Sequence, residues 1–161
     1  MGWYAEWIRR RGHARWFAAF GSKVAPRVDR VLYRLSGGRL VATGPAVFPT
    51  LLLTTVGRKS GQNRTVPLLY VRDGDNLLVA GSNWGQKEEP AWARNLSGNP
   101  RARVQIGSAR REYVARVATD EEKTGLWPKL DEMWPAYDTY RKRSGRDIKV
   151  FVLEPASPPA T

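Results

Sequence analysis

The sequence predicts an α+β domain: a small, mostly antiparallel β-barrel of about six strands with helices on its outside. From residue 50 onward, short runs rich in Val, Leu and Thr alternate with turn residues, which is typical of β-hairpins. Helix signals with recognisable start and stop residues lie among these runs. The 161 residues, of which 42% are hydrophobic, suit one domain with a core of ordinary size.

Residues 1–40 are expected to form a basic, amphipathic helical segment. Trp3 and Trp7 recur at helical spacing beside a run of three arginines, and Pro26 suits the first turn of a second helix that stops at Gly37. Aromatic residues on one face and arginines on the other are typical of a helix that lies in a membrane interface. The same pattern also fits a helix that packs on its own domain, and periodicity leaves both interpretations open.

The barrel domain is expected to span residues 41–155. Its predicted strands are residues 50–56, 65–71, 76–80, 103–106, 111–118 and 149–153. The first three are expected to form a meander, and Pro67 predicts an edge strand or a bulge because proline cannot donate to a ladder. The tail at residues 156–161, rich in Pro, Ala and Ser, is expected to be disordered.

Three helical features follow the first strands. A short helix is expected to begin after Pro90 and to stop at the turn residues 97–100. Thr119 and Glu122 have the spacing of a capping box, which predicts a helix running toward residue 134. Pro135 then restarts a helical turn.

The composition excludes several kinds of catalytic site. The chain has no Cys, which removes disulfides, thiolate nucleophiles and Cys-based zinc sites, and we expect no metal centre. A single histidine, His13, disfavours a Ser-His-Asp triad. An enzyme with this composition would depend on a cofactor for its chemistry.

Charge is distributed unevenly along the chain, whose net charge is +12. Residues 1–40 carry nine Lys and Arg against two acids, and no acid occurs between Asp29 and Asp73. Such a one-sided stretch favours an anionic partner: nucleic acid, an anionic membrane or a polyanionic small molecule. Because the sequence contains neither a transmembrane run nor a signal peptide, we expect a cytoplasmic protein.

The first candidate binding site is the expected hairpin turn at residues 57–64, Gly-Arg-Lys-Ser-Gly-Gln-Asn-Arg. Its glycines permit a tight turn whose backbone N–H groups can bind an anion, and Arg58, Lys59 and Arg64 add positive charge. Ser60 adds a neutral donor. A phosphate or carboxylate is the natural ligand, although charged turns also serve simply to deter edge pairing.

Two further segments could form a pocket. Ala80-Gly81-Ser82-Asn83 ends a strand, where glycine permits close approach of a planar ligand and the polar side chains can bind its edge. Trp134, Tyr137 and Tyr140 recur at spacings of three and suit a stacking wall whose hydroxyls can donate a proton. An ordinary strand-to-helix loop explains the first segment equally well. Aromatic residues that seal a helix onto the core are the more common explanation of the second.

The order of six segments is more specific than any one of them. They are GRKSGQNRTVPLLYVRDG, LLVAGSNWG, PAWARNLSGNPRARVQI, ATDEE, MWPAYDTY and IKVFVLEP. In this order, over roughly residues 45–155, the chain resembles the deazaflavin-dependent nitroreductase family of actinobacteria. The resemblance implies an FMN-binding-like split β-barrel that binds reduced coenzyme F420, an 8-hydroxy-5-deazaflavin with a phosphate and a polyglutamate tail. It also implies hydride transfer to quinones, nitro compounds or other electron-poor unsaturated acceptors.

The resemblance implies a set of site residues, matched by position. The residues that match the cradle of the phosphate and tail are Arg58, Lys59 and Ser60. The adjoining strand is matched by Arg64, Thr65, Val66, Pro67, Leu68 and Leu69. The loop at the deazaflavin ring is matched by Ala80, Gly81, Ser82 and Asn83, and the following helix by Ala91, Trp92, Ala93, Arg94 and Asn95.

The acceptor side is implied in the same way. The residues that match its wall are Trp134, Tyr137 and Tyr140, with Tyr137 also near the cofactor. Ser82, Tyr137 and Tyr140 are therefore the expected catalytic residues: Ser82 to orient the ring, and either tyrosine to stack on or protonate the acceptor. The founding type has Tyr at the positions of Leu69 and Trp134 and Lys at that of Asn83, so the substrate range is expected to differ.

Two other functions also fit parts of the sequence. One is an FMN-dependent oxidoreductase on the same type of barrel. The other is a non-enzymatic basic module that binds nucleic acid or membrane, but a nucleic-acid partner is not expected because no helix-turn-helix or RNP-like motif occurs. Peripheral contact of residues 1–40 with an anionic membrane is compatible with the enzyme. The sequence leaves the oligomeric state open.

Overall fold

The computed structural model describes residues 48–156 without a gap. It also describes residues 6–7, 9–10, 28, 31–33, 35–36, 40–41 and 44–45. The expected disordered tail therefore lies almost entirely outside the described residues, and so does most of the expected N-terminal helical segment. All statements below refer to the described part of the chain.

The described strands and helices alternate along the chain. The strands are β1 (Leu40–Val41), β2 (Gly44–Pro45), β3 (Thr50–Val56), β4 (Asn63–Leu69), β5 (Val71–Asp73), β6 (Asn76–Ala80), β7 (Arg101–Ile106), β8 (Ala109–Val117) and β9 (Val150–Pro155). The helices are the 3-10 turn η1 (Asn83–Gly85), α4 (Ala91–Gly98), α5 (Asp120–Met133) and α6 (Ala136–Ser144). The predicted strand at residues 76–80 and the helix after Pro90 are confirmed.

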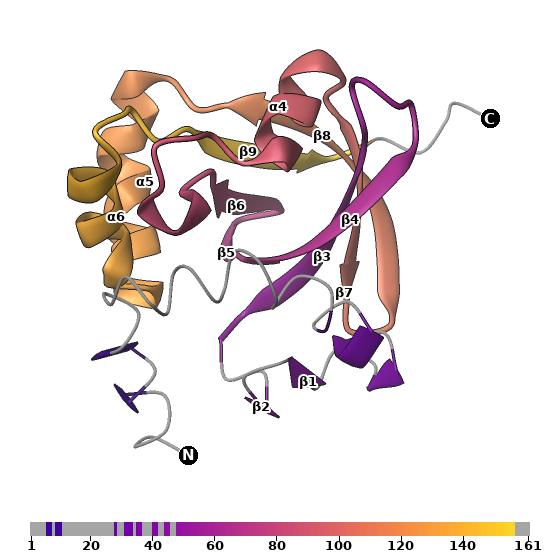
Figure 1. Cartoon of the computed structure of the whole chain (residues 1–161), viewed down its shortest axis with the longest axis horizontal. Coiled ribbons are helices and arrows are strands. Elements are labelled where there is room, and N and C mark those ends of the chain that lie inside the picture. The colour runs from indigo at the N-terminus through magenta and orange to yellow at the C-terminus, as the bar shows by residue number, and fades with distance from the viewer. Residues whose placement is uncertain are drawn as a thin grey trace.

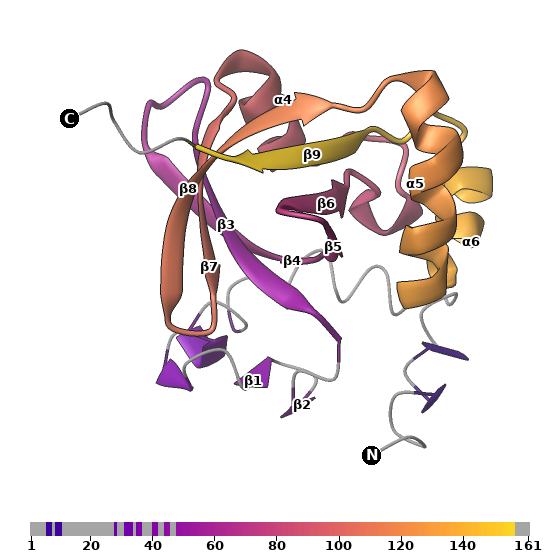
Figure 2. The ribbon, with the colours of Figure 1, turned by 180° about the vertical axis from the view of Figure 1, so that it is seen from behind.

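Seven strands form one antiparallel sheet in the order β4-β3-β7-β8-β9-β6-β5. β4 and β5 are its two edges, yet Tyr70 alone separates them in sequence. The sheet therefore curls until its edges approach each other, and β4 contacts β6 across the opening. Figures 1 and 2 show the resulting half-barrel from its two sides. The expected α+β split barrel is confirmed.

Two predicted details of the first strands are wrong. The strand expected at residues 65–71 is divided at Tyr70 into β4 and β5, because the chain must cross from one sheet edge to the other. The expected meander is absent for the same reason: β4 pairs with β3, whereas β6 pairs with β5 and β9. The prediction from Pro67 is confirmed, since β4 is an edge strand.

The sheet buries side chains on both faces. On β6, Leu77 and Val79 belong to the inner core, whereas Leu78 and Ala80 belong to a second core on the opposite face. This alternation follows from the two-residue period of a strand. Helix α4 contributes Trp92, Ala93 and Leu96 to the inner core, while α5 and α6 cover the second core. In both ribbon views α5 and α6 stand together at one end, away from the β3–β4 turn (Figures 1 and 2).

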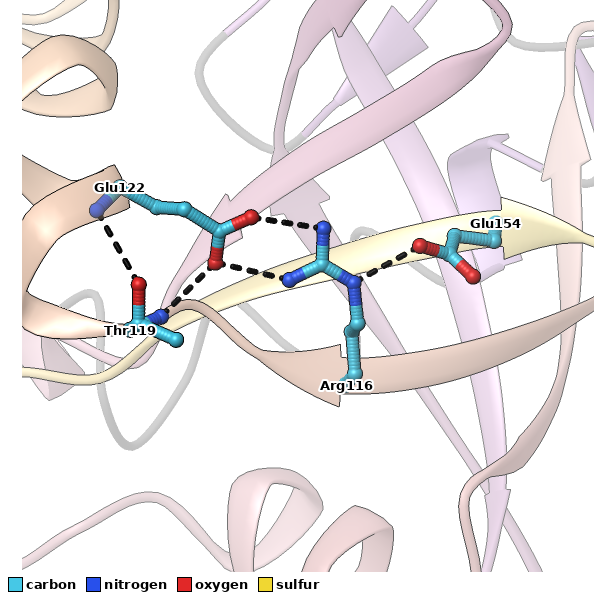
Figure 3. A network of polar contacts seen from close by, with 4 residues as sticks. All are labelled: Arg116, Thr119, Glu122 and Glu154. Carbon is cyan, nitrogen blue, oxygen red and sulfur yellow. Dashed lines mark hydrogen bonds and ion pairs between the residues drawn. The ribbon is translucent and has the colours of Figure 1, made fainter.

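The predicted capping box at the start of α5 is confirmed. The Thr119 hydroxyl accepts a hydrogen bond from the Glu122 N–H (3.2 Å), and the Glu122 carboxylate accepts one from the Thr119 N–H (2.8 Å). Figure 3 shows that the Glu122 carboxylate also accepts two hydrogen bonds from the guanidinium of Arg116 on β8. The Nε of Arg116 donates to the Glu154 carboxylate of β9. The network ties the first turn of α5 to two strands of the sheet.

One N-terminal residue is firmly attached to the barrel. Tyr33 is buried; its hydroxyl donates to the Thr50 carbonyl (2.9 Å) and accepts from the Gly107 N–H (3.1 Å). The helical stretch around residue 33 is thereby joined to the start of β3 and to the β7–β8 turn. No helix in the described part of the chain has the length and apolar character needed to span a membrane.

Candidate cofactor and acceptor site

The β3–β4 turn is compact and depends on glycine. The Gly57 N–H donates to the Gln62 carbonyl (2.8 Å), and the Gly61 N–H donates to the Gly57 carbonyl (2.7 Å). A Cβ at Gly57 would lie 2.8 Å from the Ser60 hydroxyl oxygen, and Gly61 has a φ of +67°. The positive φ of Gly61 and the close approach of the turn to Gly57 favour glycine at both positions. The turn leaves the side chains of Arg58, Lys59 and Ser60 exposed.

Asn95 of α4 joins this turn to the inner core. Its side-chain oxygen accepts from the Arg58 N–H (3.2 Å), and its side-chain nitrogen donates to the Thr55 hydroxyl (3.1 Å). Asn95 and Thr55 are both buried. Two predicted site residues, Arg58 and Asn95, are thus brought together although 37 positions separate them.

The turn and α4 form a surface that we call the basic edge, consisting of Arg58, Lys59, Arg64 and Arg94. All four side chains are exposed, and none forms an ion pair with a described residue. A positive surface without internal counter-charge favours an anionic ligand. The predicted phosphate-binding cations Arg58, Lys59 and Arg64 are therefore exposed and form no ion pair within the described part of the chain.

The predicted residues of β4 divide between the two faces of the strand. Val66 and Leu68 pack against the inner core, whereas Leu69 packs against the second core. The Thr65 hydroxyl is already hydrogen-bonded to that of Thr54 (2.8 Å). Only alternate side chains can face one ligand, so Thr65 and Pro67 would contribute to a site through the backbone of this edge strand.

The loop after β6 has an unusual backbone. Asn83 and Trp84 have positive φ values of 45° and 57°, and Gly85 has a φ of +76°. A Cβ at Gly85 would lie 3.0 Å from the Tyr140 Cα, so this loop packs directly on α6. The Asn83 side chain donates to the Glu88 carbonyl (2.9 Å) and thus closes the loop on itself.

Ser82 offers an unused polar group in this loop. Its residue is 8% exposed, and its hydroxyl forms no hydrogen bond with any described residue. Buried hydroxyls are normally hydrogen-bonded, and an exception calls for a ligand or a functional explanation. The predicted role of Ser82 therefore fits the structure, because a bound ring could supply the missing partner.

Some of the predicted site residues of α4 are buried in the core, whereas others are exposed to solvent. Trp92 packs on Phe151 at a ring-centroid distance of 5.3 Å, and Ala93 is fully buried. These two residues position the helix rather than present a side chain to solvent. Ala91 and Arg94 are exposed, and Arg94 is the member of this group that can meet an anion through its side chain.

The predicted acceptor residues lie in one cluster. Leu69, Trp134, Tyr137 and Tyr140 all belong to or pack against the second core. Desolvation raises the pKa of both tyrosines, that of Tyr140 to about 12, so both phenols stay protonated at neutral pH. The Trp134 side chain is hydrogen-bonded to Tyr140, whereas the Tyr137 hydroxyl forms no hydrogen bond with a described residue.

All three aromatic residues of this cluster are buried, so they also pack α6 and the end of α5 onto the second core. Leu69 and Tyr70 are adjacent in sequence but pack on different cores, Leu69 against the second and Tyr70 in the inner one.

A cavity of about 520 Å³ opens near this cluster. Its lining residues are Arg9, Pro49, Tyr70, Val71, Arg72, Lys129, Glu132 and Met133. The Arg9 guanidinium lies over the Phe48 ring, whose edge contacts Trp134 at a centroid distance of 5.0 Å. Two of the lining residues, Val71 and Met133, also pack against the second core, which contains the predicted acceptor residues.

Sequence reasoning missed Arg146, which follows α6. Its guanidinium donates to the carbonyls of Gly81 (2.8 Å), Ser82 (3.1 Å) and Gln86 (3.2 Å). Burial lowers the pKa of Arg146. One arginine in a run of basic residues gives no sequence signal for such a contact.

Among the described residues, no group of three or more His, Cys, Asp or Glu side chains could hold a metal ion.

Comparisons with known proteins agree on one family. The family model for F420H(2)-dependent quinone reductases matches residues 25–155. The F420H(2)-dependent quinone reductase Rv1261c of Mycobacterium tuberculosis is 34% identical over 143 residues, which cover 87% of this chain and 96% of the relative. The protein Rv3178 of Mycobacterium tuberculosis is 44% identical over 107 residues, covering 66% of this chain and 90% of its own length.

Solved structures support the same assignment. A structure of an F420-H2 dependent reductase (FDR-A) is similar with a TM-score of 0.61 and 34% identity, over 66% of this chain and 94% of that one. A second structure, described as a domain-swapped dimer, has a TM-score of 0.63 and 30% identity, over 80% and 97% of the two chains. The chain therefore belongs to the F420H2-dependent quinone reductase family, a family of oxidoreductases whose cofactor is coenzyme F420.

Proposed function

We propose that the protein transfers a hydride from reduced F420 to a quinone, a nitro compound or another electron-poor unsaturated acceptor. Two observations carry the proposal: the four unpaired cations of the basic edge, and the buried, unpartnered Ser82 hydroxyl in the loop after β6, which begins against Ala93 of α4. A ligand with both an anionic tail and a flat polar ring fits this pair of features. Membership of the quinone reductase family supports the same ligand.

The cofactor would be held at two places. Arg58, Lys59 and Arg94 would bind its phosphate and carboxylates, since charge-assisted hydrogen bonds are the strongest that side chains offer. Ser60 and the backbone N–H groups of the turn would complete this anion site. Ser82 would bind the edge of the ring, with Ala80 and Gly81 leaving room for its approach. When bound, the reduced deazaflavin supplies the hydride.

The acceptor would lie on the side of the second core. Tyr137 is the better candidate for the proton donor, because its hydroxyl has no described partner and its raised pKa keeps the proton in place. Trp134 and Tyr140 would form the wall of that site, with Leu69 beside them. The contribution of the protein is then mainly orientation of the two reactants and exclusion of water.

We further propose that the protein works in the cytoplasm and can touch the inner face of an anionic membrane. Val28, Val31 and Leu35 lie at helical spacing and are exposed, Leu35 by 81%. Such an apolar stripe, in a segment with many arginines, suits an interfacial helix. Flotation with vesicles containing 30% anionic lipid tests this: Val31→Asp/Leu35→Asp should reduce binding, and equal flotation of both proteins would refute it.

Titration of the protein with oxidised F420 at 150 mM salt, followed by fluorescence, tests the proposed function. We expect saturable binding in the micromolar range or tighter and no comparable binding of FMN. Oxidation of reduced F420 with menadione and with a nitroaromatic compound then ranks the acceptors. Absence of saturable F420 binding would overturn the proposal, and preferential binding of FMN would point to the FMN-dependent class.

A further inference from the structure

We infer that Arg146 is a positioning residue: by binding three carbonyls of the loop after β6, it turns the N–H groups of Ser82 and Asn83 toward the cofactor. The inference rests on the proposed function, since it assigns to this loop the role of holding the deazaflavin ring. The residue follows Gly145, which ends α6 with a φ of +64°. It thereby connects the loop to the helix that carries Tyr137 and Tyr140.

The guanidinium acts as a clamp on the loop backbone. Nη2 donates to the Gly81 and Ser82 carbonyls, and Nε donates to the Gln86 carbonyl. The planar fork of an arginine can reach three acceptors at once, whereas a lysine offers one compact charge. No described carboxylate forms an ion pair with Arg146, so its charge is directed to the loop.

The direction of the N–H groups follows from peptide geometry. No described peptide bond is cis. In a trans peptide the carbonyl and the following N–H point to opposite sides. Because the Gly81 and Ser82 carbonyls face Arg146, the N–H groups of Ser82 and Asn83 face away from it. Neither N–H has a hydrogen-bond partner among the described residues.

These two N–H groups and the Ser82 hydroxyl make three unused donors in one short segment. Such a set suits oxygen or nitrogen acceptors on the edge of a flat ring, and donors that are already oriented need no rearrangement when the ligand arrives.

The loop needs an external clamp because its own conformation is unfavourable. Asn83 and Trp84 are non-glycine residues with positive φ, a conformation that persists only where surrounding contacts enforce it. The close packing of Gly85 on Tyr140 supplies one such contact. The hydrogen bond from the Asn83 side chain to the Glu88 carbonyl supplies a second. Arg146 supplies a third, and it is the contact that binds the carbonyls on either side of Ser82.

Three substitutions test the inference in the full-length chain. Arg146→Met should raise the Kd for F420 at least tenfold, and Arg146→Lys should give an intermediate value. Arg146→Ala should regain affinity when millimolar methylguanidinium is added. Arg103→Ala is the matched control, an exposed arginine paired with Glu112 far from the loop, and should bind F420 normally with or without methylguanidinium.

A second measurement separates positioning from general stability. Amide hydrogen exchange of residues 82–85 in the free protein should accelerate in Arg146→Met while exchange in β8 and β9 stays unchanged, and the KM for menadione should change less than twofold. Wild-type affinity in Arg146→Met, or lost affinity with faster exchange throughout the barrel and no rescue, would overturn the inference. If the wild type itself fails to bind F420, the proposed function fails, whereas the exchange experiment still tests the clamp.

Discussion

The two ends of the barrel use positive charge in different ways. At the end formed by α5 and α6, three cations are bound to acids: Arg116 to Glu122 and Glu154, Lys123 to Asp120 and Asp147, and Arg141 to Asp131, whereas Arg146 binds loop carbonyls. At the other end, the four cations of the basic edge have no described counter-charge. Figures 1 and 2 place these ends on opposite sides of the molecule.

The comparison shows that net charge alone does not identify a ligand site. The arginine network of Figure 3 stabilises a helix terminus and a strand pair, and its charge is largely neutralised within the fold. The unpaired cations of the basic edge and the unpartnered Ser82 hydroxyl have no such structural use. We call the end with the ion pairs of Arg116, Lys123 and Arg141 the paired end. The difference predicts that substitutions at the basic edge affect cofactor binding, while substitutions of residues in the ion-pair and capping network of the paired end affect stability.

The largest effect is expected from Arg58→Ala/Lys59→Ala. Charge-assisted hydrogen bonds contribute about 1.5–3 kcal/mol each, so losing two should raise the Kd for F420 by at least about 100-fold. The melting temperature should hardly change, because both side chains are exposed. Arg110→Ala/Arg111→Ala at the β7–β8 turn removes the same charge and serves as the control. Equal losses of affinity in both variants would show that only net charge matters.

Asn95→Ala should lower both the stability of the protein and its affinity for F420. It leaves the buried Thr55 hydroxyl and the Arg58 N–H without their partner, which should lower the free energy of unfolding by about 2 kcal/mol. It should also weaken F420 binding, because the turn loses its link to α4. Urea denaturation measures the first effect, with exposed Asn63→Ala as the control. A variant as stable as the wild type would contradict the described link.

Ser82→Ala should separate binding from stability. One hydrogen bond contributes about 0.5–1.5 kcal/mol, so the Kd for F420 should rise about three- to tenfold. The free protein should be no less stable, since the deleted hydroxyl has no described partner. Ser97→Ala on α4 is the control for the same chemical change. A loss of stability without a change in Kd would assign Ser82 to the fold.

Thr119→Ala should act only at the paired end. Loss of an N-cap hydroxyl lowers the free energy of unfolding by about 1 kcal/mol. The Kd for F420 should stay within twofold of the wild type. Thr124→Ala, on the exposed side of the same helix, is the matched control. Weakened F420 binding in Thr119→Ala would show that the two ends are coupled.

The smallest effect is a pH dependence at Glu122. Arg116, and then the Thr119 N–H, lower the pKa of the Glu122 carboxyl to about 2. A carboxyl whose pKa is lower in the folded than in the unfolded protein stabilises the fold at pH values above its unfolded pKa. This stabilisation is lost as the pH falls from about 4.5 to about 2. The difference in melting temperature between the wild type and Glu122→Gln should therefore shrink over this range. A difference independent of pH would contradict it.

Much of the fold follows from local signals that the sequence contains. Thr119 and Glu122 identify the start of α5, and Pro67 identifies an edge strand, because both depend on neighbouring backbone groups. The division at Tyr70 could not be read in this way. It arises where the curled sheet passes from one edge to the other, and the apolar run from Thr65 to Val71 continues through it.

The candidate site was predictable as a set of segments but not as a set of contacts. The order of the motifs identified the family, and the charge of the β3–β4 turn identified its basic residues. The bridge from Asn95 to Arg58 and the clamp of Arg146 join residues distant in sequence, so no local pattern contains them. Which cations lack an ion pair also depends on where the fold places the acidic side chains, and the sequence alone does not show this.

The proposed role of the basic edge is to bind the anionic part of the cofactor. The most direct measurement compares the affinity of F420 with that of a deazaflavin lacking the phosphate and the glutamate tail. We expect the wild type and Arg110→Ala/Arg111→Ala to prefer F420 about 100-fold, and Arg58→Ala/Lys59→Ala to show little preference. Equal affinity of the wild type for both deazaflavins would contradict the claim.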